Sequence, residues 1–528
     1  MKKQYFSSLI TFFLCFGYTH AQNAGDLDIS FGTGGLADID LGEGNNYCRS
    51  IALQTDQKLV LFGKAEIDGL YRPTLVRLNT DGALDESFGS AGIAVGDLLF
   101  DATHHEEARS LVIQPDGKFL CVYCTDFFES SYTITRFNVD GSIDTDFGTA
   151  GSMETAPCSF FNRPRSILLQ ADGNILVLGF GRNSAIGVNR WTAVRFTPSG
   201  DLDITFDGDG IWIREPSEQT AGAFDAVQQP DGKIVIAGND SYLNENEWSE
   251  GRCMLIRLNL DGSYDNTFAE EGIGIYDVSE SGASPMAVAL QGDGSILMAG
   301  STSTLDTGLD ALLVRVTPDG ELDSTFGIDG FITSGLPDTD RAQSMVVMQD
   351  GNIMLGGLYH GLGLVVPGLL IKYSADGIQD MSFGNEDGYS TTQNSTGVYY
   401  GEEIIQQADG KIVLAGSNVQ GANYTRYFSA SRFLIDDVNT VLENGSNNPV
   451  VTVYPNPACD QIFIRFKDDV LRDVTLLSII DHAGKWVWQS AQVRQNISVD
   501  VAHLSEGIYT LAVQYKDTIA HQAIVIIK

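Results

Sequence analysis

The chain has 528 residues, of which 69 are acidic and only 32 are basic, so its formal net charge is −37. A chain of this length exceeds one ordinary hydrophobic core and predicts several domains or a repeat architecture. Because Lys and Arg are scarce, we expect neither a nucleic acid nor an anionic membrane surface as a partner. The acidity is interpreted as a solubility feature, with a cationic partner or bound calcium as the alternative.

The chain begins with a predicted secretory signal peptide, residues 1–21. Lys2 and Lys3 precede an apolar run that ends at Phe16, and the small residues of the following THA stand where a signal peptidase cuts. This run is too short to span a membrane. No later stretch reaches the length of a spanning helix, so we expect no transmembrane segment in the mature chain.

A nine-residue phrase then recurs seven times, in copies such as LDISFGTGG, LDESFGSAG and LDSTFGIDG. Its phenylalanines lie 57 to 62 residues apart. They are Phe31, Phe88, Phe147, Phe206, Phe268, Phe326 and Phe383. Self-similarity at a fixed period indicates a repeat architecture with one copy of the phrase in each module of about 59 residues.

Two further phrases recur once per module. One, as in QPDGKIVIAG (229–238) and QADGKIVLAG (407–416), places Asp-Gly between two apolar runs and predicts a tight hairpin of two strands. The other, as in LIRLNLDG (255–262) and LVRVTPDG (313–320), predicts a strand that carries a basic residue and ends in a turn. With a strand after the first phrase, each module has four.

Seven modules of four antiparallel strands predict an all-β fold in which residues 22–437 form a seven-bladed β-propeller. A single blade leaves its faces exposed, whereas blades stacked in a ring cover one another. The nine-residue phrase is interpreted as the corner that each joint between blades needs. We expect residues 26–35 to dock beside residues 428–437, so that the two ends of the propeller close the ring.

A charged residue that recurs in every module is interpreted as part of the scaffold. We expect the basic residue of the strand phrase to pair with the aspartate of the corner phrase. The aspartates are Asp28, Asp85, Asp144, Asp203, Asp265, Asp323 and Asp380, and the basic residues are Arg77, Arg136, Arg195, Arg257, Arg315, Lys372 and Arg432. The N-x-D-G-x-x-D runs lack the terminal Glu of a calcium loop, so no cofactor is expected, with calcium as the alternative.

Together the three phrases resemble the bacterial delta-60 repeat, a unit of about sixty residues regarded as propeller-forming. The resemblance extends over about residues 26–437. It implies the propeller fold, and it implies no reaction and no catalytic motif.

A ligand site is expected on the loops that differ between modules, which the strand order places on one rim. The candidate ligand-binding residues on this face are His104, His105, Glu106, Glu107, Arg163, Arg165, Trp191, Tyr242, Trp248, Tyr359, His360 and Tyr399. Exposed aromatic residues beside polar groups would suit a sugar. The HHEE run is a weak metal signal, and we assign no metal ligand and no catalytic residue.

A polar linker, residues 438–449, separates the propeller from residues 450–528, which alternate like the strands of a small Ig-like β-sandwich. The motifs YPNP, HAGKWVW and LSEGIY resemble the type A sorting domain of the type IX secretion system of Bacteroidota. This resemblance implies recognition by that secretion machinery and a secreted or outer-membrane surface-attached protein. Its sorting motif corresponds here to Tyr454, Pro455, Asn456, Pro457, Gly507 and Tyr509.

These features predict a secreted or cell-surface binding module whose ligand is a polysaccharide or a surface protein. One alternative is an extracellular glycan- or ester-cleaving enzyme that uses loop carboxylates. A second is a structural component of the cell surface or gliding apparatus. Because the sequence contains no GxSxG, HExxH, P-loop or dinucleotide motif, an enzyme is the less favoured reading.

Overall fold

The computed structural model describes residues 22–42, 44–99, 108–124, 131–184, 187–215, 221–243, 249–279, 282–304, 308–360, 366–384, 387–392, 398–420, 425–435, 451–454, 461–466, 474–480, 485–490, 496–505, 507–515 and 518–526. Contacts divide the chain into two compact units. One spans Ala24–Asp436, and the other contains the C-terminal strands. We describe each unit separately.

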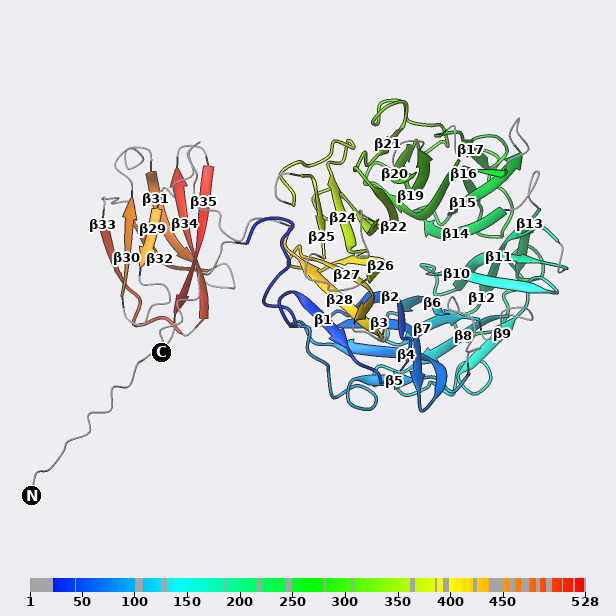
Figure 1. The fold of residues 1–528 in the computed structure, drawn as a ribbon, viewed down its shortest axis with the longest axis horizontal. Helices are drawn as coiled ribbons and strands as arrows, with labels where there is room; N and C mark the ends of the chain where they lie inside the picture. Colours follow the sequence, from blue (N-terminus) through cyan, green and yellow to red (C-terminus); the bar gives the residue numbers. More distant parts are fainter. Residues whose placement is uncertain are drawn as a thin grey trace, which may run out of the picture. The chain divides into compact units, whose positions relative to one another are not determined.

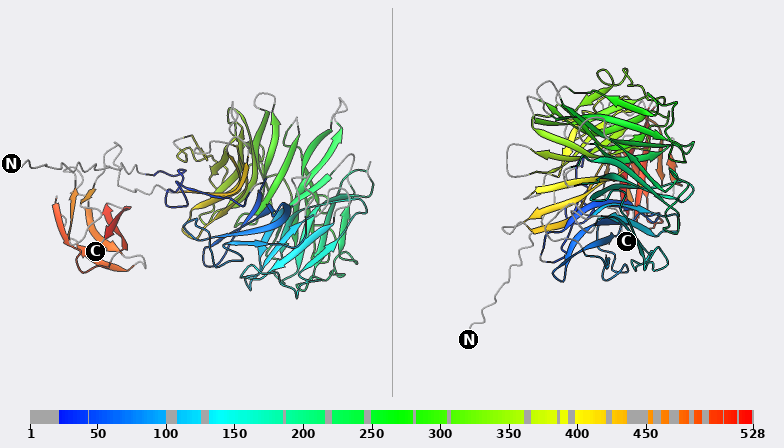
Figure 2. Two further views of the ribbon diagram at one scale, coloured as in Figure 1. Left: turned by 60° about the horizontal axis from the view of Figure 1, so that its bottom comes forward. Right: turned by 90° about the vertical axis from the view of Figure 1, so that its right-hand side faces the viewer.

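In the described residues, the first unit contains seven four-stranded antiparallel sheets, called blades 1 to 7, which follow one another around a ring in chain order (Figures 1 and 2). Blade 1 contains β2 (Tyr47–Leu53), β3 (Leu59–Ile67), β4 (Leu70–Leu78) and β5 (Ile93–Val95). Blade 2 contains β6 (Ala108–Ile113), β7 (Phe119–Tyr123), β8 (Tyr132–Phe137) and β9 (Ser152–Thr155). Blade 3 contains β10 (Phe161–Leu169), β11 (Ile175–Arg182), β12 (Arg190–Phe196) and β13 (Ile211–Arg214).

Blade 4 contains β14 (Ala221–Gln228), β15 (Ile234–Leu243), β16 (Ser249–Leu258) and β17 (Ile273–Tyr276). Blade 5 contains β18 (Ala283–Leu290), β19 (Ile296–Thr304), β20 (Gly308–Val316) and β21 (Phe331–Thr333). Blade 6 contains β22 (Thr339–Val347), β23 (Ile353–His360), β24 (Gly368–Tyr373) and β25 (Tyr389–Thr391). Blade 7 contains β26 (Val398–Gln406), β27 (Ile412–Gln420), β28 (Thr425–Phe433) and β1 (Leu36–Ile39).

The middle strands of each blade are apolar on both faces because each blade is covered by two neighbours. In β15, Ile234 and Ile236 are fully buried in the core between blades 3 and 4, while Val235 is fully buried between blades 4 and 5. Successive side chains of a strand point to opposite faces, so one strand supplies both cores. A hydrophobic cluster of this kind lies at every joint around the ring, including the joint between blades 7 and 1. The all-β propeller fold is thereby confirmed.

The strand that follows the corner phrase belongs to the preceding blade, which corrects the expected grouping of strands. β5 pairs with β4, with Thr74 opposite Val95, and it forms no ladder with β6. The corner is itself a tight turn, in which the Phe88 amide donates to the Asp85 carbonyl (3.0 Å) and the Gly92 amide to the Phe88 carbonyl (2.8 Å). A turn this tight returns the chain along the strand it has just left. The crossing to the next blade therefore follows β5.

The two ends of the propeller share one sheet, as expected from the docking of residues 26–35 beside residues 428–437. β1 pairs with β28, with Leu36 opposite Ser431. The Asp28 amide donates to the Arg432 carbonyl (2.8 Å), and the Arg432 amide donates to the Gly35 carbonyl (3.0 Å). The first strand of the chain thus completes the last blade.

The C-terminal unit is a β-sandwich. One sheet contains β29 (Val451–Tyr454), β30 (Gln461–Phe466) and β33 (Asn496–Asp500), and the other contains β32 (Trp486–Ser490), β31 (Val474–Ile480), β34 (Gly507–Tyr515) and β35 (Thr518–Ile526). Ile462 and Val499 of the first sheet share a buried core with Leu477, Ile479 and Leu511 of the second. Across the described part of the chain, no helix is long and apolar enough to cross a membrane.

Candidate binding site in the central channel

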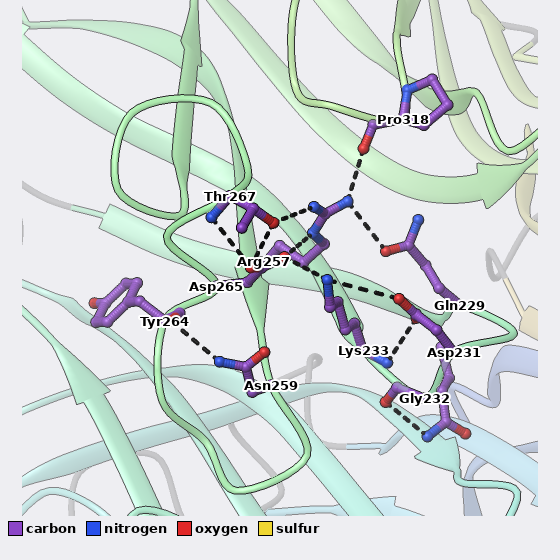
Figure 3. A network of polar contacts seen from close by, with 11 residues as sticks. Gln229, Asp231, Gly232, Lys233, Arg257, Asn259, Tyr264, Asp265, Thr267 and Pro318 are labelled. Atoms are coloured by element: carbon purple, nitrogen blue, oxygen red, sulfur yellow. Dashed lines mark hydrogen bonds and ion pairs between the residues drawn. The ribbon is translucent and has the colours of Figure 1, made fainter.

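The repeated charged residues meet at the joints between blades, as Figure 3 shows for blades 4 and 5. Arg257 Nε donates to Asp265 Oδ2 (2.7 Å), and its Nη1 donates to the carbonyl oxygen of Pro318 in the next blade (2.7 Å). Lys233 Nζ, from the hairpin phrase, lies 2.9 Å from the same carboxylate oxygen. All three repeated phrases therefore meet in one network.

The same pairing occurs around the whole ring. The Nε to Oδ2 distances are 2.6–2.8 Å in the pairs Arg77–Asp85, Arg136–Asp144, Arg195–Asp203, Arg315–Asp323 and Arg432–Asp28, and Lys372 Nζ lies 3.0 Å from Asp380. Burial of Asp265 opposes its ionisation, but the hydroxyl and amide of Thr267 and the cations of Lys233 and Arg257 hold its pKa well below the usual range. A paired carboxylate that occurs at every joint holds the blades together and is a poor candidate for a ligand site.

Two of the aromatic residues expected on the ligand face are fully buried. The Trp191 indole donates to the carbonyl of Asn239 in the next blade (3.0 Å), and the Tyr399 hydroxyl donates to the Leu414 carbonyl (2.9 Å). Tyr132 of blade 2 is buried in the same way. The expectation of exposure is wrong for Trp191 and Tyr399 because aromatic side chains near strand ends fill the joints between blades.

Other candidates are dispersed over different blades. Tyr359 donates to Asp338 Oδ2 (3.0 Å), and the neighbouring His360 is exposed at the end of β23. In blade 4, Tyr242 lies under the Arg252 guanidinium at 4.6 Å. Arg163 of β10 is buried and donates to Cys124 Sγ. Outside the described residues lie His104, His105, Glu106, Glu107, Trp248, Pro455, Asn456 and Pro457.

The remaining residues of the expected sorting motif lie in the sandwich. Tyr454 ends β29, and Gly507 begins β34. The Tyr509 side chain is buried in the sandwich core, and its hydroxyl donates to the Ser505 carbonyl (3.0 Å). This tyrosine therefore supports the fold of the unit.

A second set of equivalent residues lines the centre of the ring. The inner strands of the seven blades are β2, β6, β10, β14, β18, β22 and β26. Each of them contacts the inner strands of both neighbouring blades. Each also contains one β-bulge at the same place. The bulged residues are Arg49, Arg109, Arg165, Phe224, Met286, Gln343 and Glu402, and we call them the channel ring.

The bulges explain why these side chains reach the channel. In a regular inner strand, side chains would point alternately toward the two neighbouring blades, and a bulge redirects one of them. All seven residues of the channel ring line one cavity of about 140 Å³. One position on each of seven separate segments is therefore brought together at a single place.

The channel ring concentrates positive charge in an acidic chain. Arg49, Arg109 and Arg165 come from three consecutive blades, whereas the whole chain has only 32 basic residues. Arg49 forms an ion pair with Glu402 across the joint between blades 1 and 7. Two aromatic rings, Phe180 and Phe224, lie 5.1 and 5.4 Å from the Arg165 guanidinium. Stacking engages the face of a guanidinium and orients its N–H donors in the plane of the group.

In blades 1 and 6, the serine after the bulge connects neighbouring blades. Ser50 Oγ accepts from the Leu111 amide of blade 2 (3.1 Å), and Ser344 Oγ accepts from the Ile404 amide of blade 7 (3.2 Å). These hydrogen bonds satisfy backbone amides that have no further strand to pair with. The position after the bulge is therefore structural.

Two carboxylic acids occupy the same position in blades 4 and 7. Asp225 accepts from the Ser166 hydroxyl of blade 3 (2.9 Å) and from the Val288 amide of blade 5 (3.0 Å), and Glu403 accepts from the Ile51 amide of blade 1 (2.9 Å). Burial raises the pKa of Asp225 to about 6 and that of Glu403 to about 7. Both acids make the bond to the next blade that serines make elsewhere.

The sequence reasoning missed Arg49, Arg109 and Glu402, although it singled out Arg165. Each channel-ring residue lies five positions before the first residue of the hairpin phrase, such as Gln54 or Gln114. This column reads R, R, R, F, M, Q, E through the seven modules, whereas the position before it is apolar or small in every module. A variable column inside a repeated strand is the signal that could have identified the channel ring.

The calcium-like runs are turns. In the first, the Ala83 amide donates to Asp81 Oδ1 (3.0 Å), and Asn79 Nδ2 donates to the Leu84 carbonyl (3.3 Å). Asn and Asp commonly stabilise turns by such bonds. Within the ranges that the structure describes, no three His, Cys, Asp or Glu side chains are grouped in a way that could hold a metal ion.

Two protein families match the chain. Residues 452–528 match the secretion system C-terminal sorting domain, and residues 54–88, 170–206, 229–268 and 291–326 match the domain of unknown function (DUF5122) beta-propeller. These matches confirm the two resemblances seen in the sequence. The sorting domain indicates secretion through the type IX machinery and attachment to the cell surface or outer membrane. No curated protein matches the chain.

Several solved structures are similar to the chain at low identity. They include virginiamycin B lyase from Staphylococcus aureus (12% identity, TM-score 0.40, 75% of this chain and 98% of that one) and the polysaccharide lyase Uly1 (11%, 0.42, 75% and 91%). An alpha-L-arabinanase from Penicillium chrysogenum gives 9% identity and a TM-score of 0.39 over 78% of this chain and 98% of that one. Similarity this low supports no conclusion about the ligand or the reaction of this chain.

Proposed function

We propose that this secreted protein, whose repeats match the DUF5122 propeller family and whose tail is a secretion-system sorting domain, is a cell-surface binding module that takes its ligand into the central channel. The observation that carries the proposal is the channel ring. Seven bulges turn one side chain from every blade toward the same cavity. Bulges commonly re-aim side chains next to functional sites.

The composition of the channel ring supports binding over simple packing. A ring that only filled space would be apolar, because burying charged groups costs free energy unless they are paired. Here four of the seven residues are charged and Gln343 is polar. The repeated joint residues already connect the blades at every joint, although Arg49 and Glu402 of the channel ring also pair across one of them.

The size of the cavity favours a saccharide over a protein surface. Pockets for drug-sized ligands have volumes of about 300–1,000 Å³. A specific protein interface buries about 1,200–2,000 Å² of surface in total. The 140 Å³ cavity instead suits one small unit, such as a single sugar of a polysaccharide.

Binding is preferred to the enzyme alternative because of what the two acids at the ring do. A general acid requires a proton that faces the substrate. Asp225 and Glu403 accept hydrogen bonds from the backbone of the next blade, at the position that Ser50 and Ser344 occupy in other blades. Their raised pKa values follow from burial at a structural position.

The test uses the mature full-length chain on a glycan array, followed by isothermal titration of the best binder. Met286→Trp adds a large ring to the channel, and Met381→Trp makes the same change at a residue that is 54% exposed in a corner phrase. We expect Met286→Trp to weaken binding roughly 100-fold by filling the cavity, and Met381→Trp to bind like the parent. Equal binding by both variants, with unchanged melting temperatures, would contradict the proposal.

A further inference from the structure

We infer that the channel ring recognises one acidic sugar unit, bearing a carboxylate or sulfate, at the end of a polysaccharide chain. This inference rests on the proposed function, because it names the ligand of the same site. It is carried by three features of the channel ring: its arginines, the unequal distribution of its side chains, and its enclosure by seven strands.

The arginines indicate an anionic ligand. A guanidinium presents a planar set of donors that matches a carboxylate or sulfate in a bidentate fashion. Arg49, Arg109 and Arg165 occupy equivalent positions in blades 1, 2 and 3, so their guanidinium groups are next to one another around the cavity. Two of the ring's other residues, Phe224 and Met286, are apolar, and Gln343 is neutral.

Three carboxylic acids line the same cavity as the three arginines. Glu402 pairs with Arg49, and Asp225 and Glu403 accept hydrogen bonds from backbone amides of neighbouring blades. The cavity lining therefore has little net charge, and its positive side is the one formed by the arginines of blades 1 to 3.

The distribution of side chains suits a sugar with one charged edge. The arginines lie on blades 1 to 3, and Phe224 and Met286 lie on blades 4 and 5. An acidic sugar can direct its anionic group toward the arginines while its apolar ring face contacts Phe224 and Met286. A neutral sugar could not form an ion pair with the guanidinium groups.

The enclosure restricts how a polymer can enter. The inner strands of seven blades surround the channel ring, and the cavity has room for about one sugar unit. A polysaccharide lying across the ring would have to pass through the strands. The bound unit is therefore a chain terminus that enters along the channel axis.

The experiment is isothermal titration of the mature full-length chain with trigalacturonate, its methyl ester, hexagalacturonate and a sulfated disaccharide. We expect trigalacturonate to bind at least tenfold more tightly than its ester, and the hexamer to match the trimer within about threefold. Arg109→Gln and Arg165→Gln should each weaken binding about tenfold or more, since each removes a bidentate donor. The matched control is Arg190→Gln, because Arg190 lies outside the channel ring and pairs with the exposed Glu215. Binding of the sulfated disaccharide alone would assign the anion as sulfate.

The outcomes separate this inference from the proposed function. If the ester binds as well as the acid and Met286→Trp still abolishes binding, the channel binds a ligand but the acidic class is wrong. If Met286→Trp leaves binding intact, the channel proposal itself fails. Tighter binding of a polyglutamate peptide, affinity that rises steadily with oligosaccharide length, or no binding of any acidic oligosaccharide would overturn the inference.

Discussion

Arg432 Nε donates to Asp28 Oδ2 at 2.8 Å, although the two residues lie 404 positions apart in the chain. The same pair within the other blades spans only eight positions, as for Arg257 and Asp265. The joint that closes the ring is thus built from the same parts as the joints that the chain forms locally. The end of the propeller depends on residues 28–39 for one aspartate and one strand.

Arg432→Met should destabilise the joint between β28 and the N-terminal residues that closes the ring. The pair is buried, with side-chain exposures of 6% and 5%, and loss of one partner of a buried ion pair costs about 3 kcal/mol or more of unfolding free energy. Urea unfolding checks this value. The control is Arg190→Met, whose partner Glu215 is 67% exposed, and we expect a loss below about 1 kcal/mol. Equal losses for the two variants would contradict the assigned role.

Arg257→Lys should cost less than Arg257→Met at the joint between blades 4 and 5. Lysine can keep the ion pair, as Lys372 does with Asp380 at 3.0 Å, but it lacks the second donor that reaches the Pro318 carbonyl. We expect a loss of about 1 kcal/mol for lysine and about 3 kcal/mol for methionine. Chemical denaturation measures both. A lysine variant as unstable as the methionine variant would show that the link to the next blade dominates.

Gly141→Ala tests the packing of a strand-phrase turn against the preceding blade. Gly141 has φ +88°, and an added Cβ would lie 2.9 Å from the Phe88 ring. Gly410 has the same φ, and its Cβ would have no neighbour within 4 Å. Gly410→Ala should therefore cost only the backbone strain, about 1 kcal/mol, and Gly141→Ala roughly 2 kcal/mol more. Equal thermal shifts in the two variants would show that the contact with Phe88 is unimportant.

Stability should fall on both sides of mildly acidic pH. The corner aspartates have lowered pKa values, so their contribution is present above the unfolded pKa near 4 and is lost as the pH falls below it. Burial raises the pKa of Asp225 to about 6 and that of Glu403 to about 7. Between about pH 4 and pH 7 the folded state therefore binds more protons than the unfolded state does. The free energy of unfolding should fall as the pH rises through this range.

The urea midpoint at pH 5 and pH 8 measures the second limb, and Asp225→Asn isolates one group. The asparagine cannot ionise, so the decrease in midpoint between the two pH values should be smaller than in the parent chain. The variant keeps one oxygen that can accept from the Val288 amide. An unchanged decrease would show that Asp225 does not titrate in this range.

The repeated phrases predicted the propeller fold and the closure of the ring because each phrase is a local turn with its own chemistry. The Asp-Gly hairpins and the corner turns each depend on a few adjacent residues. The grouping of strands was predicted wrongly, because the pattern of apolar residues marks β5 as a strand without showing which neighbour it pairs with. That choice follows from the tight turn at Phe88 and Gly92.

Most residues of the candidate site could not be predicted from the sequence, because they lie about sixty positions apart along the chain. Trp191 and Tyr399 are aromatic residues near strand ends, and the sequence cannot show that they fill joints. Arg49 and Arg109 sit inside apolar strands, where a bulge turns each toward the channel. A bulge follows from pairing geometry, which leaves little trace in the local pattern.

The most direct test of the central claim is a crystal structure of the mature chain with the tightest-binding oligosaccharide from the titration panel. We predict density for one terminal sugar in the channel, with its anionic group within hydrogen-bond distance of Arg109 or Arg165. Density for the ligand on the outer wall, such as the groove lined by Glu270, Tyr276 and Glu321, with an empty channel ring, would contradict the account.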